Sequence, residues 1–304
     1  MALLQATHGQ QAAPEAPRPL GPSLLAASAE TSWWLWPNLL SLDAPIVCAL
    51  WAILFARAYS LRLSWPEVAA LFGSVWIIYA SDRLLDVWRC PNIWQLRRRH
   101  LFAASHSVFF LILIPIVGLF VGAVVLPRLA RAEVDMGLGL SLLVAAYLLS
   151  VHWAGPSVRG QLPKELAVGT FFAMGTTLPL WAVWRFSDLI LPLTLFACLC
   201  SLNCMAIDRW ENPKIRRSAS TNRTSLEGNA SERLHWTCLG IFAAVAFSGL
   251  LRGIAPPALW GMASSALLLA LIHENQRRFT AEQLRVLADL ALVLPAAVML
   301  VTAW

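Results

Sequence analysis

Charged residues are scarce in this chain. Asp, Glu, Lys and Arg together make up 13% of its 304 residues, whereas 58% are hydrophobic and the mean hydropathy is +0.63. This profile is not that of a soluble domain, and it is typical of a helical protein that crosses a membrane several times. The composition therefore predicts an integral membrane protein.

Metal-binding and redox cysteine motifs are also lacking. The six cysteines do not have the spacing of metal ligands, and Cys198, Cys200 and Cys204 lie in one apolar run, where buried thiols are ordinary core residues. The net charge of +6 is modest, and Lys and Arg gather in short loops. This pattern indicates roles in topology and contact with anionic membrane lipids, and it gives no case for a nucleic-acid partner.

The N-terminal region lacks the pattern of a cleaved signal peptide. No basic segment precedes an apolar core there, and residues 1–32 are rich in Ala, Pro and small polar residues. We therefore predict a disordered tail over residues 1–32 and a membrane domain over residues 33–304.

Apolar segments long enough to cross a bilayer follow one another along the rest of the chain. Open strands cannot satisfy their backbone in lipid, so each segment is predicted to be a helix and the fold to be all-α, with nine transmembrane helices. The predicted spans are 39–58, 66–86, 102–127, 136–155, 164–184, 188–208, 235–252, 257–273 and 284–303.

Most of the loop Lys and Arg residues follow the even-numbered predicted helices. Positively charged loops stay in the cytoplasm, so this bias predicts a cytoplasmic N-terminus and an external C-terminus. The expected location is the inner (plasma) membrane of a bacterium.

An acidic pair closes the second predicted helix. Asp82 and Asp86 are four residues apart, so both carboxylates share one face of a helix, one turn apart. Such a pair at the end of a membrane helix needs a divalent cation or basic partners. The alternative is a helix end reaching into the lipid headgroups, with Arg83 and Arg89 as salt-bridge partners.

The sixth predicted helix ends in a second acidic pair, on the same predicted side of the membrane. Asp208 and Glu211 are three residues apart and can share a helix face, and Asn203 is within reach of the same space. The alternative here is a solvated helix end with Arg209 as counter-ion.

Two acidic helix ends on one membrane face favour a magnesium site that bridges protein carboxylates to substrate phosphates. A lipid diphosphate meets that requirement, because its head binds metal and basic residues and its tail enters the bilayer. Arg159 and Lys164 precede the fifth predicted helix and are candidate phosphate partners. Further candidates follow the sixth helix at Lys214, Arg216 and Arg217.

The predicted helix count, the two acidic helix ends and the basic link resemble the UbiA superfamily of intramembrane prenyltransferases. The first family motif, Asn-Asp-x-x-Asp-x-x-x-Asp, falls on residues 78–86, where Asp82 and Asp86 match and the leading Asn-Asp is replaced by Ile78-Tyr79. The family's Lys-Arg pair falls on Val158-Arg159, so that only the arginine is kept.

The second family motif matches less well. With Asp208 on its middle aspartate, Asn212 takes the last position; with Asn203 on the leading Asn, Glu211 takes the last position and Ile207 the middle. Gly169 and Gly175 resemble the family's small-residue stretch in the fifth helix.

The resemblance implies Mg²⁺-dependent transfer of a prenyl group from an isoprenyl diphosphate to an aromatic or other lipophilic acceptor. The implied residues are Asp82, Asp86 and Asp208 for catalysis, these three with Glu211 for the metal, Arg159, Lys164 and Arg83 for the diphosphate, and Asp43, Asn203 and Tyr79 for the acceptor or for support. The alternatives are an intramembrane terpene cyclase of the same superfamily and a non-catalytic or transport protein for an anionic lipid.

Four polar residues outside these motifs are weighed separately. Asp43, near the start of the first predicted helix, is either a functional intramembrane acid or a helix-start residue. Asp289 and the pair His273-Glu274 flank the last predicted cytoplasmic loop and are expected to be solvated.

Overall fold

The computed structural model describes residues 32–89, 97–153, 164–211 and 256–302, together with residues 237, 240, 243 and 244. The chain divides into the units Met1–Trp36 and Pro37–Trp304, and the fold considered below is that of the second unit. The predicted tail and most of the seventh predicted helix lie outside the described residues.

Helices make up the described part of the chain, which contains no strand. In order they are η1 (Trp33–Leu35), α2 (Trp36–Leu39), α3 (Asp43–Ala58), α4 (Trp65–Arg89), α5 (Arg98–Ser105), α6 (Ser107–Phe120), η3 (Val121–Val125), η4 (Leu126–Arg128), α7 (Arg131–Trp153), α9 (Lys164–Trp181), α10 (Phe186–Glu211), α13 (Pro256–Glu274), η5 (Gln276–Arg278) and α14 (Ala281–Thr302).

Five segments of the described chain are long and apolar enough to cross a membrane, or six if the bent pair Trp33–Leu39 and Asp43–Ala58 forms one span. The five are Trp65–Arg89, Ser107–Arg128, Arg131–Ser150, Ser187–Glu211 and Ala281–Thr302. The all-α prediction is thus confirmed for the described residues, whereas the prediction of nine transmembrane helices is not. The helices α9 and α13 have 18 and 19 residues, and neither qualifies as a span by length and apolarity.

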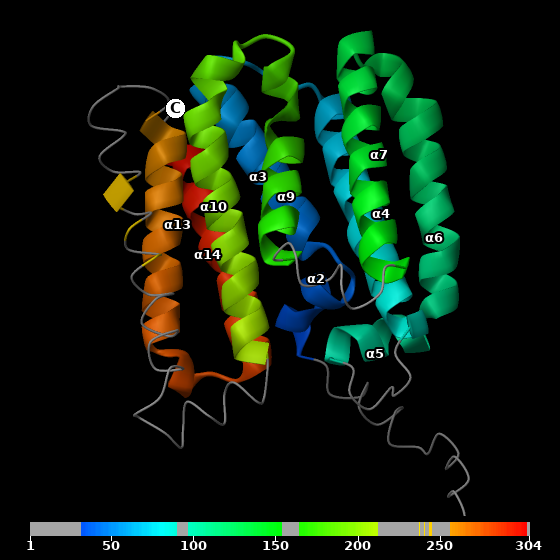
Figure 1. Ribbon diagram of the computed structural model, residues 1–304, viewed down its shortest axis with the longest axis vertical. Helices are drawn as coiled ribbons and strands as arrows, with labels where there is room; N and C mark the ends of the chain where they lie inside the picture. Colours follow the sequence, from blue (N-terminus) through cyan, green and yellow to red (C-terminus); the bar gives the residue numbers. More distant parts are fainter. Residues whose placement is uncertain are drawn as a thin grey trace, which may run out of the picture. The chain divides into compact units, whose positions relative to one another are not determined.

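The predicted span 102–127 is divided in two. α5 ends at Ser105, and α6 begins at Ser107. The Ser105 hydroxyl, 3.0 Å from the Phe102 carbonyl oxygen and 2.9 Å from Nδ1 of His106, supports the break. Figure 1 shows α5 lying across one end of the helix bundle, beside the end of α4, rather than along the other helices.

Local sequence sets where three long helices begin. Before α4, the backbone N–H and the hydroxyl of Ser64 donate to the Glu67 carboxylate at 2.5 and 2.6 Å. Before α14, the Thr280 N–H donates to the side-chain oxygen of Gln283 at 2.9 Å, and the Gln283 N–H donates to the Thr280 hydroxyl at 3.2 Å. Before α7, the Ala130 N–H donates to the Glu133 carboxylate at 3.0 Å. These pairs satisfy N–H groups that the first turn of a helix leaves free.

The main core lies between α3, α9, α10, α13 and α14. Trp51 is fully buried; its ring centroid lies 4.7 Å from that of Phe196, with the two rings tilted by 38°, and its indole N–H donates to the Leu292 carbonyl at 3.0 Å. Where α9 crosses α10, a Cβ on Gly169 would lie 2.5 Å from the backbone nitrogen of Ser201, so this close approach requires glycine. The crossing fixes the two helices that carry Lys164 and Asp208.

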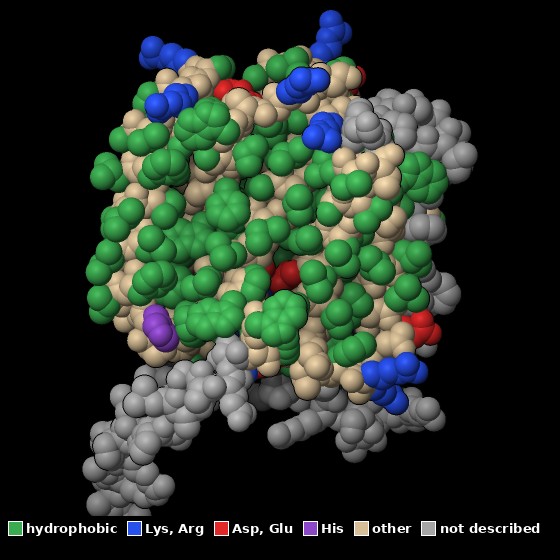
Figure 2. Space-filling view, turned by 180° about the vertical axis from the view of Figure 1, so that it is seen from behind, with side chains coloured by type: hydrophobic (Ala, Val, Ile, Leu, Met, Phe, Trp, Pro, Cys, Tyr) green, Lys and Arg blue, Asp and Glu red, His purple; other side chains and the backbone are tan. Residues whose placement is uncertain are grey.

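The charged side chains gather at the ends of the bundle. Figure 2 shows one face covered mostly by hydrophobic side chains, with most of its Lys, Arg, Asp and Glu near the upper and lower ends and acidic atoms visible in a hollow at mid-height. In Figure 1, the ends of α4 and α10 that carry the predicted acidic pairs lie at the same end of the bundle, where α14 begins. An apolar band between two charged ends is what a bilayer requires of a spanning protein.

Candidate ligand-binding site

A cavity of about 770 Å³ lies between the helices of the described bundle. Along α4 its lining extends from Glu67 in the first turn to Asp86 near the end, which corresponds to about 28 Å of helix. Apolar side chains from α4, η3, α7 and α9 line its body, including Val75, Val121, Val144 and Phe171. Charged residues also line the cavity, apart from those near the start of α4; they are Asp43, Asp82, Arg83, Asp86, Arg97, Arg99, Lys164, Glu165, Asp208, Arg285 and Asp289. We call this part of the cavity its charged end.

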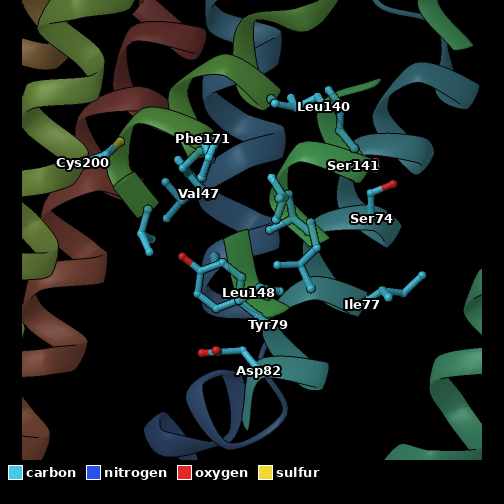
Figure 3. A pocket seen from close by; sticks show the side chains of 18 of the residues that line it. Val47, Ser74, Ile77, Tyr79, Asp82, Leu140, Ser141, Leu148, Phe171 and Cys200 are labelled. Carbon is cyan, nitrogen blue, oxygen red and sulfur yellow. The ribbon is translucent and has the colours of Figure 1, made fainter. Parts of the chain in front are cut away.

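The first predicted acidic pair belongs to this lining. Figure 3 shows Tyr79 and Asp82 extending from α4 toward the same side of the cavity, whereas Ile77 extends the other way. Asp86, one turn beyond Asp82, lies with its Oδ2 4.0 Å from Nδ1 of His100 on α5. Both carboxylates therefore face space that a ligand can enter.

The contact between Asp86 and His100 is not an ion pair at neutral pH. Burial, and then the positive charges of Arg99, Arg83, Arg97 and Arg285, lower the pKa of His100 from 6.5 to about 3. The imidazole is consequently neutral, so its contact with Asp86 is one between a carboxyl group and an uncharged ring.

The second predicted acidic pair is divided between two roles. Asp208 lines the cavity and is 51% exposed, and its ion pair with Arg97, at 3.1 Å, is a weak surface contact. Glu211 lies outside the lining, and its carboxylate is held by Arg97 at 2.5 Å, Arg99 at 2.6 Å and Arg285 at 3.5 Å. A carboxylate held by three guanidinium groups argues against Glu211 as a free metal ligand.

The predicted phosphate partners also differ in their surroundings. Lys164 begins α9, lines the cavity and is exposed. Arg83 is buried, donates to the Asn38 carbonyl and lies 3.8 Å from Asp43, so we expect it to position Asp43 rather than to hold a phosphate. Arg159 lies outside the described residues.

Three arginines that sequence reasoning assigned only to topology line the cavity: Arg97, Arg99 and Arg285. The arginine run that opens α5 was the available signal, but its approach to the end of α10 depends on the break at His106. These guanidinium groups make this end of the cavity suitable for an anionic group.

A metal held by the protein alone does not fit the described residues, in which no three His, Cys, Asp or Glu side chains converge on one point. Mg²⁺ can instead be held by one or two carboxylates together with substrate phosphates. The adjacent carboxylates of Asp82 and Asp86, with Asp208 on the same cavity, fit that second arrangement.

A second polar cluster surrounds Asp43. Its Oδ2 accepts a hydrogen bond from Nδ2 of Asn38 at 2.7 Å and lies 3.6 Å from Nη2 of Arg285. Asp289 lines the cavity and its Oδ2 atom is enclosed among the described residues, so the expectation of a solvated loop-end residue was wrong. The same expectation fails for His273, which is buried and accepts a hydrogen bond from the Trp210 indole N–H at 3.1 Å.

Comparison with known proteins found no matching family model, no matching curated protein and no matching solved structure.

Proposed function

We propose that this chain is an intramembrane prenyltransferase that uses Mg²⁺ and an isoprenyl diphosphate. The observation that carries the proposal is the cavity, whose apolar body leads to an end lined by both carboxylates and guanidinium groups. An isoprenyl diphosphate has the matching form, with a hydrocarbon tail and a head of several negative charges. The acceptor would be a second lipophilic molecule that enters the same cavity.

The charged end supplies the groups that such a head needs. Asp82 and Asp86, with Asp208 across the cavity, would hold Mg²⁺ against the diphosphate oxygens. When bound, the metal neutralises charge on the departing diphosphate and so eases cleavage of the bond to the prenyl carbon. Lys164, which is exposed, and Arg97, whose side chain is 37% exposed, would bind the remaining oxygens.

The apolar body would protect the reacting carbon from water. Tyr147 and Phe171 line the cavity with their ring centroids 5.4 Å apart, and aromatic faces attract positive charge as it develops on an allylic carbon. Excluding water also strengthens the electrostatic contacts at the charged end. In a terpene cyclase, the same arrangement would act on the prenyl chain alone, without an acceptor.

Binding and transport of an anionic lipid is the second candidate function. The extent of the cavity favours it, because the lining includes Glu67 at one end of α4 and Asp86 at the other. A carrier would bind an isoprenyl diphosphate and release it intact, whereas an enzyme would release inorganic diphosphate.

The test is incubation of the purified full chain with allylic diphosphates of several lengths, with Mg²⁺ and with a chelator. The proposal predicts Mg²⁺-dependent release of inorganic diphosphate in the presence of a lipophilic acceptor. Release without any acceptor, together with a cyclic product, would identify a cyclase. Tight binding without release under every condition would contradict an enzyme and favour the carrier.

A further inference from the structure

His100 is a buried histidine on the cavity, and the chemistry proposed above gives it no role. It lies in the first turn of α5, where its backbone N–H donates to the Arg97 carbonyl at 2.9 Å. Only 8% of the residue is exposed, and it belongs to the lining of the cavity. The start of α5 therefore holds this imidazole against the space that a ligand can enter.

Nδ1 of His100 is enclosed and has no hydrogen-bond partner among the described residues. Oδ2 of Asp86 lies 4.0 Å from it, which is too long for a hydrogen bond. A buried polar nitrogen without a partner costs free energy, and native structures rarely leave one unsatisfied. An oxygen atom of a bound molecule would supply the missing partner.

The surroundings of the imidazole favour an anionic oxygen as that partner. The pKa of His100 lies far below neutral pH, so the ring is uncharged and carries a single N–H. The carboxylate of Asp86 faces Nδ1 and favours the tautomer with the proton on that nitrogen, because a lone pair there would point at negative charge. Several arginines, foremost Arg99, make the space beside the ring positive. A hydrogen-bond donor in positive surroundings suits a phosphate oxygen.

The order of residues along α4 indicates which phosphate His100 would meet. Val75 and Ile78 line the cavity and precede Asp82, so a hydrocarbon tail in the apolar body lies on that side of Asp82. Asp86 is four residues further on, which corresponds to about 6 Å along the helix axis. The phosphate attached to the tail then falls near Asp82, and the terminal phosphate falls near Asp86 and His100.

We propose that His100 donates a hydrogen bond from Nδ1 to the terminal phosphate of an isoprenyl diphosphate, and that it thereby makes the cavity select diphosphates over monophosphates. A monophosphate whose tail fills the apolar body has no second phosphate to place beside Asp86. His100 therefore adds affinity for the diphosphate alone. This inference rests on the ligand of the proposed function, but not on its reaction.

The experiment uses the full chain in phosphatidylcholine nanodiscs with Mg²⁺, and it compares dodecyl diphosphate with dodecyl phosphate. Neither probe is turned over, because a saturated chain forms no allylic cation. The dissociation constant of each probe is measured by equilibrium binding, with empty nanodiscs as the blank. We expect His100→Leu to weaken binding of dodecyl diphosphate about tenfold, the scale of one well-made hydrogen bond, and to leave dodecyl phosphate unchanged.

Three further variants separate the hydrogen bond from packing. His100→Asn should recover most of the lost affinity, because the side-chain nitrogen of asparagine, like Nδ1 of histidine, is bonded to Cγ and can donate. If His100→Leu does not fold, His100→Gln takes its place, because the amide nitrogen of glutamine lies one bond further from the backbone than Nδ1. His106→Gln is the control, because it removes an exposed imidazole of the same segment that lies outside the cavity lining. It should change neither dissociation constant.

Undiminished binding of dodecyl diphosphate by His100→Leu, or an equal loss for both probes, overturns this role of His100. Release of inorganic diphosphate from allylic diphosphates is measured on the same preparation of the unaltered chain to separate the two proposals. Diphosphate selectivity that depends on His100, without release, leaves the inference in place and contradicts the enzyme. Release with no dependence of binding on His100 contradicts the inference alone.

Discussion

Nη1 of Arg99 lies 2.6 Å from Oε1 of Glu211, and this contact joins the start of α5 to the end of α10. Burial by this arrangement is the main cause that lowers the pKa of Arg99 from 12.5 to about 10. Of the two residues, only Arg99 lines the charged end of the cavity. The contact also separates the structural carboxylate, Glu211, from Asp208, which remains exposed to the cavity.

Glu211→Gln should therefore lower the stability of the folded protein. The change leaves three guanidinium groups without their shared counter-charge, and breaking a largely buried ion pair costs about 3–5 kcal/mol. We expect a lower thermal unfolding temperature in detergent. The control is Glu282→Gln, whose ion pair with Arg98 at 3.4 Å is solvent-exposed and should contribute about 0–1 kcal/mol. An unchanged unfolding temperature for Glu211→Gln, with lost Mg²⁺ binding, would make Glu211 a metal ligand instead.

Gly169→Ala tests the crossing of α9 and α10. The added Cβ would meet the backbone nitrogen of Ser201 at 2.5 Å, so the helices must move apart, at a cost of about 1–3 kcal/mol. Gly175→Ala on the same helix is the control, because its nearest neighbour, Cδ2 of Leu140, would be 3.8 Å away. Thermal unfolding should separate the two variants, and equal unfolding temperatures would refute the close approach.

Gly137→Leu tests whether the cavity body holds a hydrocarbon tail. An added Cβ at Gly137 meets no atom within 4 Å, and the residue lines the cavity, so leucine would occupy part of its volume. We expect binding of long allylic diphosphates to weaken more than binding of short ones, as measured by competition against a fixed short probe. Gly139→Leu is the control, because an added Cβ at Gly139 also meets no atom within 4 Å but the residue lies outside the cavity lining. It should leave the binding of both long and short diphosphates unchanged. An identical effect of both variants at every chain length would contradict this use of the cavity.

His100 gives the folded protein a defined sensitivity to acid. Its pKa is about 3 in the folded state and 6.5 when unperturbed, so the unfolded chain binds an extra proton between these values. Stability therefore falls as the pH is lowered from 6.5 toward 3. With a chelator present, the unfolding temperature should drop less for His100→Gln than for the unaltered chain between pH 7 and 4.5. His106→Gln removes an exposed imidazole of the same segment as a control. Parallel curves for all three proteins would show that His100 is not held neutral.

The helices could be predicted from the sequence because an apolar segment of about 20 residues that crosses a membrane can satisfy its backbone hydrogen bonds in few structures other than a helix. The grouping of Asp82, Asp86 and Asp208 on one cavity agrees with the predicted shared face of the two acidic helix ends. Metal binding at these residues and the cytoplasmic orientation stay predictions.

The partners of the charged residues could not be predicted. The spacing of residues along a helix predicts which face of the helix a side chain occupies, but it does not predict which residue of another helix lies opposite that side chain. Asp289 and Glu211 illustrate this, because their neighbours come from α3 and α5, more than 100 residues away. The separate α5 was missed for a related reason, since residues 102–127 form one apolar run in which a single hydrogen-bonded turn at His106 changes the direction of the chain.

Asp86→Asn, compared with Glu274→Gln, is the most direct test of the proposed active site. Asp86 lines the cavity, whereas Glu274 is an exposed carboxylate at the end of α13 and outside the lining. The measurement is Mg²⁺-dependent release of inorganic diphosphate at saturating Mg²⁺, with the fold of each variant checked by its elution profile. The account predicts a loss of about 10²–10³ in rate for Asp86→Asn and little change for Glu274→Gln. Full turnover by Asp86→Asn, or equal losses at both positions, would contradict it.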